Sequence, residues 1–140
     1  MAQIIELVNY IMNVSLEISI GEFFDKLTIL EIKKNRIKDA EKLVNINNEL
    51  GWLNKLLVEQ PFSRSDVEQE VGDLKKVNEA LWEIEDDIRE QESQKSFGDR
   101  FIELARSVYI ENDKRSKIKR EINMKLGSDF VEEKSYEEYQ

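Results

Sequence analysis

Residues that interrupt helices are almost absent from this sequence. Proline occurs once, at Pro61, and glycine occurs only five times in 140 residues. A sheet protein of this length needs many tight turns, and glycine and proline are the residues that make them. Instead, the chain is rich in leucine, isoleucine, glutamate and lysine, a composition that indicates long helices. The sequence therefore predicts an all-α fold.

Cysteine and histidine are both missing from the chain. Without cysteine there can be no disulfide, no thiolate metal site and no cysteine nucleophile. Without histidine there can be no Ser-His nucleophile pair and no histidine-ligated zinc site. Any catalysis would have to rest on carboxylates, lysine, arginine, tyrosine, serine, threonine or asparagine. The composition alone does not decide whether the chain is an enzyme.

The formal net charge is −9. A surface of this sign argues against binding to nucleic acid or to an anionic membrane, because both need a basic face. The first basic residue is Lys26, so residues 1–14 lack the positive start of a secretory signal peptide. No apolar run approaches transmembrane length. We therefore expect a cytoplasmic protein that binds neither nucleic acid nor membrane.

The first two predicted helices have clear boundaries. Ser19 and Glu22 have the spacing of an N-terminal capping box, which opens a helix over residues 20–38. Asp39 caps a second helix, which ends before Pro61. Spacings of three and four residues alternate along this second helix, which indicates a coiled-coil-type seam. The residues of the seam are Leu43, Ile46, Leu50, Leu53 and Leu57.

Two longer helices follow. Ser65 and Glu68 form a second capping box, and the helix that they open ends at a polar connection over residues 91–98. A fourth helix follows this connection and ends at Gly127. The sequence therefore predicts four helices, three of them long.

The positions of the turns predict how these helices pair. With the first turn centred on Phe62, apolar residues of the second and third helices face each other along their whole length. This register also places Trp52 against Gly72, which has no side chain. A second turn near Lys95 pairs the third and fourth helices in the same way. The predicted architecture is an antiparallel helical bundle.

The chain divides into three parts on this interpretation. Residues 14–127 form the bundle domain, and its first residues, 14–20, alternate apolar and polar side chains, which predicts a short extended segment. Residues 1–13 form an accessory N-terminal extension. Residues 128–140 form an acidic C-terminal tail.

One level of the bundle breaks the apolar pattern. The register places Asn78 and Asn112 among apolar positions, and Glu31 lies at a similar height on the first helix. Buried polar groups cost free energy unless they hydrogen-bond to one another. Two interpretations are open. In the first, the residues form a polar layer that sets the helix register or they face solvent; in the second, they line a small-ligand or ion site inside the bundle.

Carboxylates at helical spacing form a second candidate site. Glu22 and Asp25 lie three residues apart, and so do Glu83 and Asp86 within the acidic run of the third helix. Such pairs on facing helices hold Mg²⁺ in all-α nucleoside-triphosphate pyrophosphohydrolases, and Mg²⁺ prefers oxygen ligands. A solvated acidic face, or an acidic docking patch for a basic partner, explains the same residues, because a chain with 30 acidic residues produces such pairs by chance.

Four stretches in order along the chain carry a family resemblance. The first stretch comprises residues 19–22, 25–26 and 28–33, and the second comprises residues 81–89 (LWEIEDDIR). The third comprises residues 101, 103–106, 108–109, 112–113, 115 and 119–123, and the fourth comprises residues 131–136 (VEEKSY). Together they resemble a helical family catalogued as domain of unknown function 6165. The resemblance covers residues 14–136 and implies a helical fold without an assigned activity. Its polar motif residues add Asp113 and Arg115 to the candidate ligand-binding set of Glu31, Asn78 and Asn112.

Two functions are compatible with these observations. The first is an interaction or scaffold module that binds a protein partner or forms a homo-oligomer and needs no cofactor. The second is a Mg²⁺-dependent enzyme that acts on a phosphorylated or nucleotide substrate, with Glu22, Asp25, Glu83 and Asp86 as metal ligands. The chain has long amphipathic helices and no recognisable nucleophile, general base or phosphate loop, which favours the first.

Overall fold

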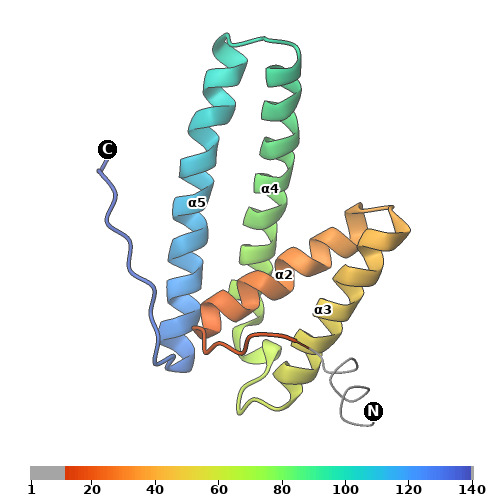
Figure 1. Cartoon of the computed structure of the whole chain (residues 1–140). Helices are drawn as coiled ribbons and strands as arrows, with labels where there is room; N and C mark the ends of the chain where they lie inside the picture. Colours follow the sequence, from red (N-terminus) through yellow and green to blue (C-terminus); the bar gives the residue numbers. More distant parts are fainter. Residues whose placement is uncertain (1–11, 140) are drawn as a thin grey trace.

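The structure is a computed structural model that describes residues 12–139 (Figure 1). Within this part the chain forms four α-helices and no strand, so the predicted all-α class is confirmed. A turn of 3-10 helix, η1, precedes the third helix. The elements are α2 (Ile20–Arg36), α3 (Ala40–Val58), η1 (Arg64–Val67), α4 (Glu68–Ser93) and α5 (Asp99–Leu126).

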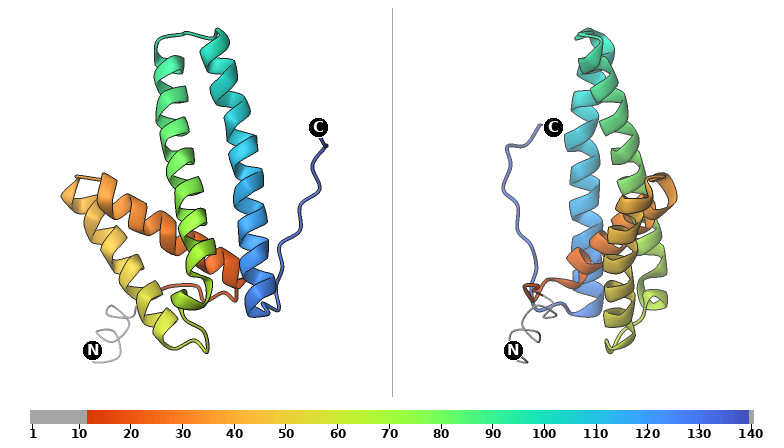
Figure 2. Two further views of the ribbon diagram at one scale, coloured as in Figure 1. Left: turned by 180° about the vertical axis from the view of Figure 1, so that it is seen from behind. Right: turned by 45° about the vertical axis from the view of Figure 1, so that its right-hand side comes forward.

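The helices form two antiparallel hairpins of different length. The longer hairpin is α4 with α5, and the shorter one is α2 with α3. Helix α2 crosses the lower half of the longer hairpin and contacts both of its helices. The upper half of the α4–α5 hairpin projects beyond α2 and α3, as Figure 2 shows from two further sides. This crossing positions the polar site described below.

The predicted pairing of the helices is confirmed for one turn and wrong for the other. Helices α4 and α5 pair about a connection that contains Lys95, which has a positive φ of 53°. Helix α3, however, packs along α2 and does not run along α4. Trp52 is accordingly 59% exposed, and the space beside Gly72 is empty to 4 Å. Apolar side chains attract without direction, so a matching pattern could not identify the partner helix.

Helix α2 explains why α3 takes this place. It is the most deeply buried helix, with side chains of Phe24, Leu27 and Leu30 in the core. The connection after it is only three residues long, which folds α3 directly back onto it. The predicted seam of α3 therefore faces α2. The central core consists of Phe23, Phe24, Leu27, Leu30, Ile46, Leu50, Val67, Val71, Leu74 and Ile122.

The helix boundaries follow local capping chemistry. Asp39 caps α3, because its Oδ1 accepts from the Lys42 amide at 2.9 Å. The second capping box lies two residues before the predicted one: the Ser63 amide donates to Asp66 Oδ2 at 2.8 Å and opens η1. Gly127 ends α5 with a φ of +67°, a left-handed conformation that glycine adopts without steric cost.

Both ends of the described chain are extended. Residues 12–19 form neither helix nor strand, so the segment predicted over residues 14–20 ends one residue early, where α2 begins; residues 128–139 run back along the outside of α5 (Figure 1). The predicted N-terminal extension, residues 1–13, lies outside the described residues except for its last two. None of the described helices combines the length and the apolar character that crossing a membrane requires.

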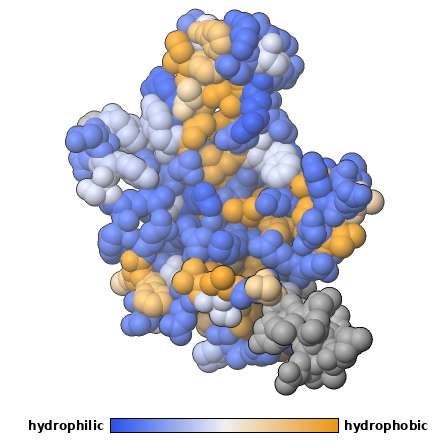
Figure 3. Space-filling view, in the orientation of Figure 1, coloured by the Kyte–Doolittle hydropathy of each residue, from blue (hydrophilic) through white to orange (hydrophobic). Residues whose placement is uncertain are grey.

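Apolar surface is not confined to the core. In Figure 3 an apolar stripe follows the projecting part of the α4–α5 hairpin, and further apolar patches lie lower on the same face. Phe97 and Ile102, near the hairpin tip, are among the exposed large apolar side chains. Helix α3 contributes Val44, Trp52 and Val58 to the exposed set.

Candidate functional site

A network of polar side chains lies where α2 crosses α4 and α5, with Asp25 of α2 at its centre. Asp25 is only 1% exposed. Arg115 of α5 binds both carboxylate oxygens: Nε donates to Oδ1 at 2.9 Å, and Nη2 donates to Oδ2. Asn78 of α4 donates a further hydrogen bond to Oδ1 at 3.0 Å. One buried carboxylate thus connects three helices.

Thr28 and Asn112 complete this part of the network. The Thr28 hydroxyl donates to the Asp25 carbonyl at 3.0 Å and accepts from Asn78 Nδ2 at 3.1 Å. Asn112 Oδ1 accepts from Arg115 Nη1 at 3.5 Å. Because the two hydrogens of the Asn78 amide are used on Asp25 and Thr28, its orientation is set by its neighbours on α2.

Lys119 of α5 forms the second part of the network. Its buried Nζ donates to Glu22 Oε2 of α2 at 2.6 Å and to Glu132 Oε2 of the tail at 3.1 Å. It also lies 3.8 Å from Asp25 Oδ2. Three carboxylates therefore surround one ammonium group, and the tail is the outer layer of the site. Glu22 does not complete the predicted capping box by bonding back to Ser19; only Ser19 caps the helix, by accepting from the Glu22 amide.

Backbone amides at the start of α2 hydrogen-bond to side chains at the end of α5 and just after it. The Gly21 amide donates to Asn123 Oδ1 at 2.6 Å, and the Ile20 amide donates to Ser128 Oγ at 3.2 Å. The first amides of a helix have no partner within the helix, so distant side chains satisfy them here. A Cβ at position 21 would overlap the carbonyl oxygen of Lys119, and only glycine permits this approach.

The charges of the network stabilise one another. Burial alone would raise the pKa of Asp25, but the hydrogen bonds from Arg115 and Asn78 outweigh it and hold that pKa below its ordinary value. Burial would lower the pKa of Lys119, but its bonds to Glu22 and Glu132 raise it instead. The bond to Asp25 also raises the pKa of Arg115. These three groups are charged at neutral pH, whereas general acid–base catalysis needs a group with a pKa near the working pH.

The predicted metal ligands do not form one cluster. Glu22 and Asp25 lie together, but both contact Lys119. Glu83 forms an ion pair with Arg36 on the surface. Asp86 lies on the wall of a groove between α2 and α4. Between residues 12 and 139 no group of three or more acidic side chains is arranged to hold a metal ion.

The candidate ligand-binding residues separate into two sets. Asn78, Asn112 and Arg115 meet in the network. Glu31 instead accepts two hydrogen bonds from Arg64 of η1, at 2.9 and 3.0 Å. Asp113 lies on the outer side of α5 and accepts from the Tyr139 hydroxyl at 2.8 Å. The level that interrupted the apolar pattern is therefore a hydrogen-bonded polar layer, but Glu31 and Asp113 are not part of it.

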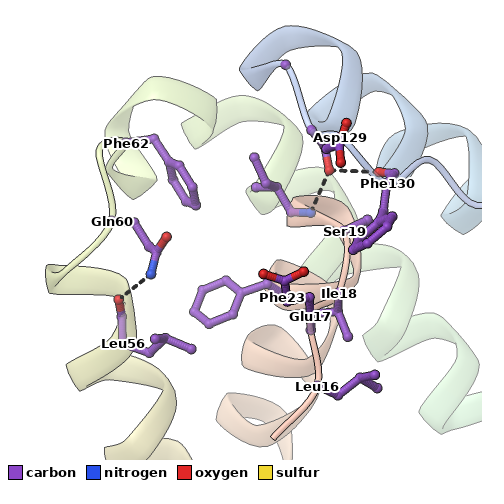
Figure 4. Close-up of a pocket in the computed structure, with 13 residues that line it drawn as sticks. Leu16, Glu17, Ile18, Ser19, Phe23, Leu56, Gln60, Phe62, Asp129 and Phe130 are labelled. Atoms are coloured by element: carbon purple, nitrogen blue, oxygen red, sulfur yellow. Dashed lines mark hydrogen bonds between the residues drawn. The ribbon is translucent and has the colours of Figure 1, made fainter.

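Two hollows lie next to this core. The first, of about 390 Å³, has Asn78 and Arg115 on its wall together with Trp82 and other apolar side chains of α2 and α4. The second, of about 510 Å³, lies between residues 16–20, the end of α3 and the turn after α5. Figure 4 shows apolar side chains such as Phe23 and Phe62 around this second hollow. It has few ionisable groups, Glu17 and Asp129 among them.

Sequence reasoning missed several members of the network and of the contact between α2 and the end of α5. Thr28, Lys119, Asn123 and Glu132 were not among the candidate residues, although all four belong to the stretches that carry the family resemblance. The signal was thus present in the motifs. The sequence did not reveal that α2 crosses α5. This crossing brings Glu22 and Lys119 together although they are 97 residues apart in the chain.

A comparison with protein families matches residues 12–139 to DUF6165, which is described as a family of unknown function. The chain belongs to the DUF6165 family. The match begins two residues before the first residue of the resemblance and includes the tail as well as the bundle. Comparison with curated proteins and comparison with solved structures each give no match. Membership of DUF6165 therefore assigns no activity to the polar network.

Proposed function

We propose that this DUF6165 protein is a protein–protein interaction module that self-associates through the outward face of α3. The observation that carries the proposal is the one-sided packing of α3. Its inner side packs on α2, whereas Val44, Trp52 and Val58 are 60%, 59% and 85% exposed. Large apolar side chains gathered on one exposed helix are typical of protein contact sites.

The charge of α3 favours a second copy of the chain as the partner. The helix carries two acidic residues, Glu41 and Glu49, and two basic ones, Lys42 and Lys55. The whole chain has a net charge of −9, so two copies repel each other over most of their surfaces. Repulsion is weakest where the local charge is balanced. An interface between identical chains is therefore least costly at α3.

The shape of the face fits a symmetric helix pair. Gly51 lies beside Trp52 in the chain, and apart from its chain neighbours and the backbone of α3 nothing lies within 4 Å of the position that its Cβ would occupy. In an antiparallel α3–α3 pair centred between these residues, each indole covers the glycine of the other copy. A two-fold interface of this kind uses the same patch on both subunits.

The polar network supports this interaction function by holding the frame that presents α3. Among the described residues, Glu70 Oε2 is the one buried side-chain nitrogen or oxygen atom without a hydrogen-bond partner. The groups around Asp25 are thus engaged with one another. Saturated networks of this type position helices and make a single packing arrangement favourable.

The test is the molar mass of the chain in solution, measured by light scattering during size-exclusion chromatography at several protein concentrations. We expect the mass of two chains, falling towards one chain on dilution. Trp52→Glu should give the single-chain mass with an unchanged helical circular dichroism spectrum. Phe97→Glu is the matched control, because it places the same charge at another exposed aromatic residue, at the far end of the α4–α5 hairpin. A wild-type chain that is a monomer at every concentration, or an equal effect of the control, contradicts the proposal.

A further inference from the structure

The C-terminal tail lies on the outer face of α5 and contacts it at two places. The first is cationic: Glu132 accepts from Lys119 at 3.1 Å, and Glu133 accepts from Arg120 at 3.0 Å. The second is aromatic: the Tyr139 hydroxyl donates to Asp113 at 2.8 Å.

The aromatic contact also involves the tyrosine rings. The ring of Tyr139 meets that of Tyr109 edge to face, with ring centres 5.1 Å apart. Edge-to-face aromatic pairs of this kind are attractive beyond the area that they bury. The outer face of α5 therefore has a cationic subsite and an aromatic subsite.

Between the two subsites the tail stands away from the helix. Glu133 and Tyr139 are six positions apart in extended chain, which is roughly 20 Å at 3.3 Å per residue. The corresponding helix residues, Arg120 and Asp113, are seven apart, or about 10 Å along the axis. The excess length bows outward, as the trace in Figure 2 shows. A hollow of about 650 Å³ lies beneath it, lined by both α5 and the tail.

The tail is thus held by side-chain anchors and not by close packing. The residues from 132 to 139 are all exposed, and no backbone hydrogen bond joins them to α5. Segments with few buried apolar contacts open locally at low free-energy cost. Residues 128–139 carry five acidic side chains and one basic one, whereas the second half of α5 is rich in lysine and arginine. The attraction between them is therefore largely electrostatic.

We propose that the outer face of α5 is a docking site for an extended acidic segment with a tyrosine, supplied by a partner protein. The chain's own tail occupies this site and must be displaced by the partner segment. Acidic side chains of the partner bind at Lys119 and Arg120, and its tyrosine packs on Tyr109 and donates to Asp113. This inference extends the proposed interaction function but uses a surface separate from α3, so each can fail without the other.

The tethered tail sets the affinity that a partner must reach. Because Gly127 joins the tail directly to the end of α5, the tail competes at an effective concentration of about millimolar. A ligand that binds only the open site has its apparent affinity reduced by the fraction of molecules that are open. Weakening the tail's own anchors should therefore strengthen the binding of the same segment added from solution.

The probe for the experiment is a fluorescently labelled peptide with the sequence of residues 128–139, titrated into the full chain by fluorescence anisotropy. The tail-released variant carries Glu132→Gln, Glu133→Gln and Tyr139→Ala, which leave α5 unchanged. We expect this variant to bind the peptide at least about tenfold more tightly than the wild-type chain, because more of its sites are open. Equal or weaker binding by the tail-released variant overturns the proposal.

A control variant with two further substitutions defines the site. Adding Arg120→Glu and Tyr109→Ala to the tail-released variant should abolish peptide binding, because both side chains are exposed and each contacts the tail directly. Retained binding places the peptide elsewhere and overturns the proposal. Lys119 is left unchanged, because it also holds Glu22 within the fold.

The same variants separate this site from α3 and from tail exchange. Trp52→Glu should leave peptide affinity unchanged whether or not it alters the molar mass, so failure at α3 is distinguishable from failure here. If instead the wild-type chain is a dimer that dissociates in the tail-released variant, the tail of a second copy fills the site. That result overturns the assignment to a separate partner.

Discussion

The amide of Gly21 donates a 2.6 Å hydrogen bond to Asn123 Oδ1 and thereby joins the start of α2 to the end of α5. The residues are 102 positions apart in the sequence. The backbone at Gly21 lies so close to the carbonyl of Lys119 that a side chain does not fit. The contact sets how deeply α2 enters between the ends of the longer hairpin, and it therefore sets the geometry of the Asp25 network.

The first prediction concerns this close approach. Gly21→Ala should lower the free energy of unfolding by about 1–3 kcal/mol, because α2 must move away from α5 to accommodate the methyl group. Chemical denaturation followed by circular dichroism measures the change. Gly72→Ala is the matched control: Gly72 lies inside α4 with open space around it, so alanine there should stabilise by about 0.5–1 kcal/mol. Destabilisation by both substitutions would mean that the close contact is not the cause.

The second prediction concerns the central carboxylate. Asp25→Asn keeps the size of the side chain but leaves the guanidinium of Arg115 without its counter-charge in a mostly buried place. We expect a loss of about 3 kcal/mol, at the lower end of the range for a broken buried pair because Arg115 is partly exposed. Glu31→Gln, which breaks the more exposed pair with Arg64, should cost less than about 1 kcal/mol. Equal losses in the two variants would contradict a special role for Asp25.

The third prediction concerns acid. The folded-state pKa of Asp25 lies below its ordinary value, so the unfolded chain binds more protons as the pH falls. The stability contributed by this group is complete at neutral pH, declines as the pH approaches about 3.9, and is lost below the folded-state pKa. Glu132 shifts in the same direction through its bond to Lys119.

Denaturation midpoints measured from neutral pH down to about pH 3 test this dependence. The wild-type chain should lose more stability over the acidic part of the range than Asp25→Asn, which lacks this titrating group. Parallel curves for the two proteins would show that Asp25 does not contribute to the acid dependence.

The fourth prediction concerns the turn into the tail. Gly127→Ala should cost about 1–2 kcal/mol, because a residue with a Cβ is strained at the left-handed φ of +67°. Gly98→Ala is the control: Gly98 precedes α5 with a φ of −81° and has open space around it, so alanine should have little effect there. Thermal unfolding of both variants compares them. A control as destabilised as Gly127→Ala would rule out the backbone conformation as the reason.

Local signals determined where the helices lie. Asp39 caps α3 and Gly127 ends α5 at the predicted positions, because capping depends on residues three or four apart and on one backbone dihedral angle. The pairing of α4 with α5 also followed from the sequence, since a short polar connection brings the two helices together antiparallel. Asn78 and Asn112 interrupt an otherwise apolar stripe in the sequence, and in the structure both hydrogen-bond within the Asp25 network.

Only the tertiary structure decided which helix the seam of α3 faces and what surrounds each polar group. The seam of α3 packs equally well against any apolar stripe of the same spacing, and α2 proved to be its partner. Glu31 and Glu83 pair with Arg64 and Arg36 outside the layer, and Asp25 pairs with Arg115 inside it.

The physical reason is the range of the forces involved. Helix propensity, capping and periodicity act between near neighbours in the chain, so the sequence by itself determined the four helices and, to within a few residues, their ends. The Asp25 network and the tail site join residues of α2, α4, α5 and the C-terminus, and their contacts depend on the angle at which α2 crosses the longer hairpin. That angle results from the packing of the whole core around Phe24 and Leu27, and no local pattern encodes it.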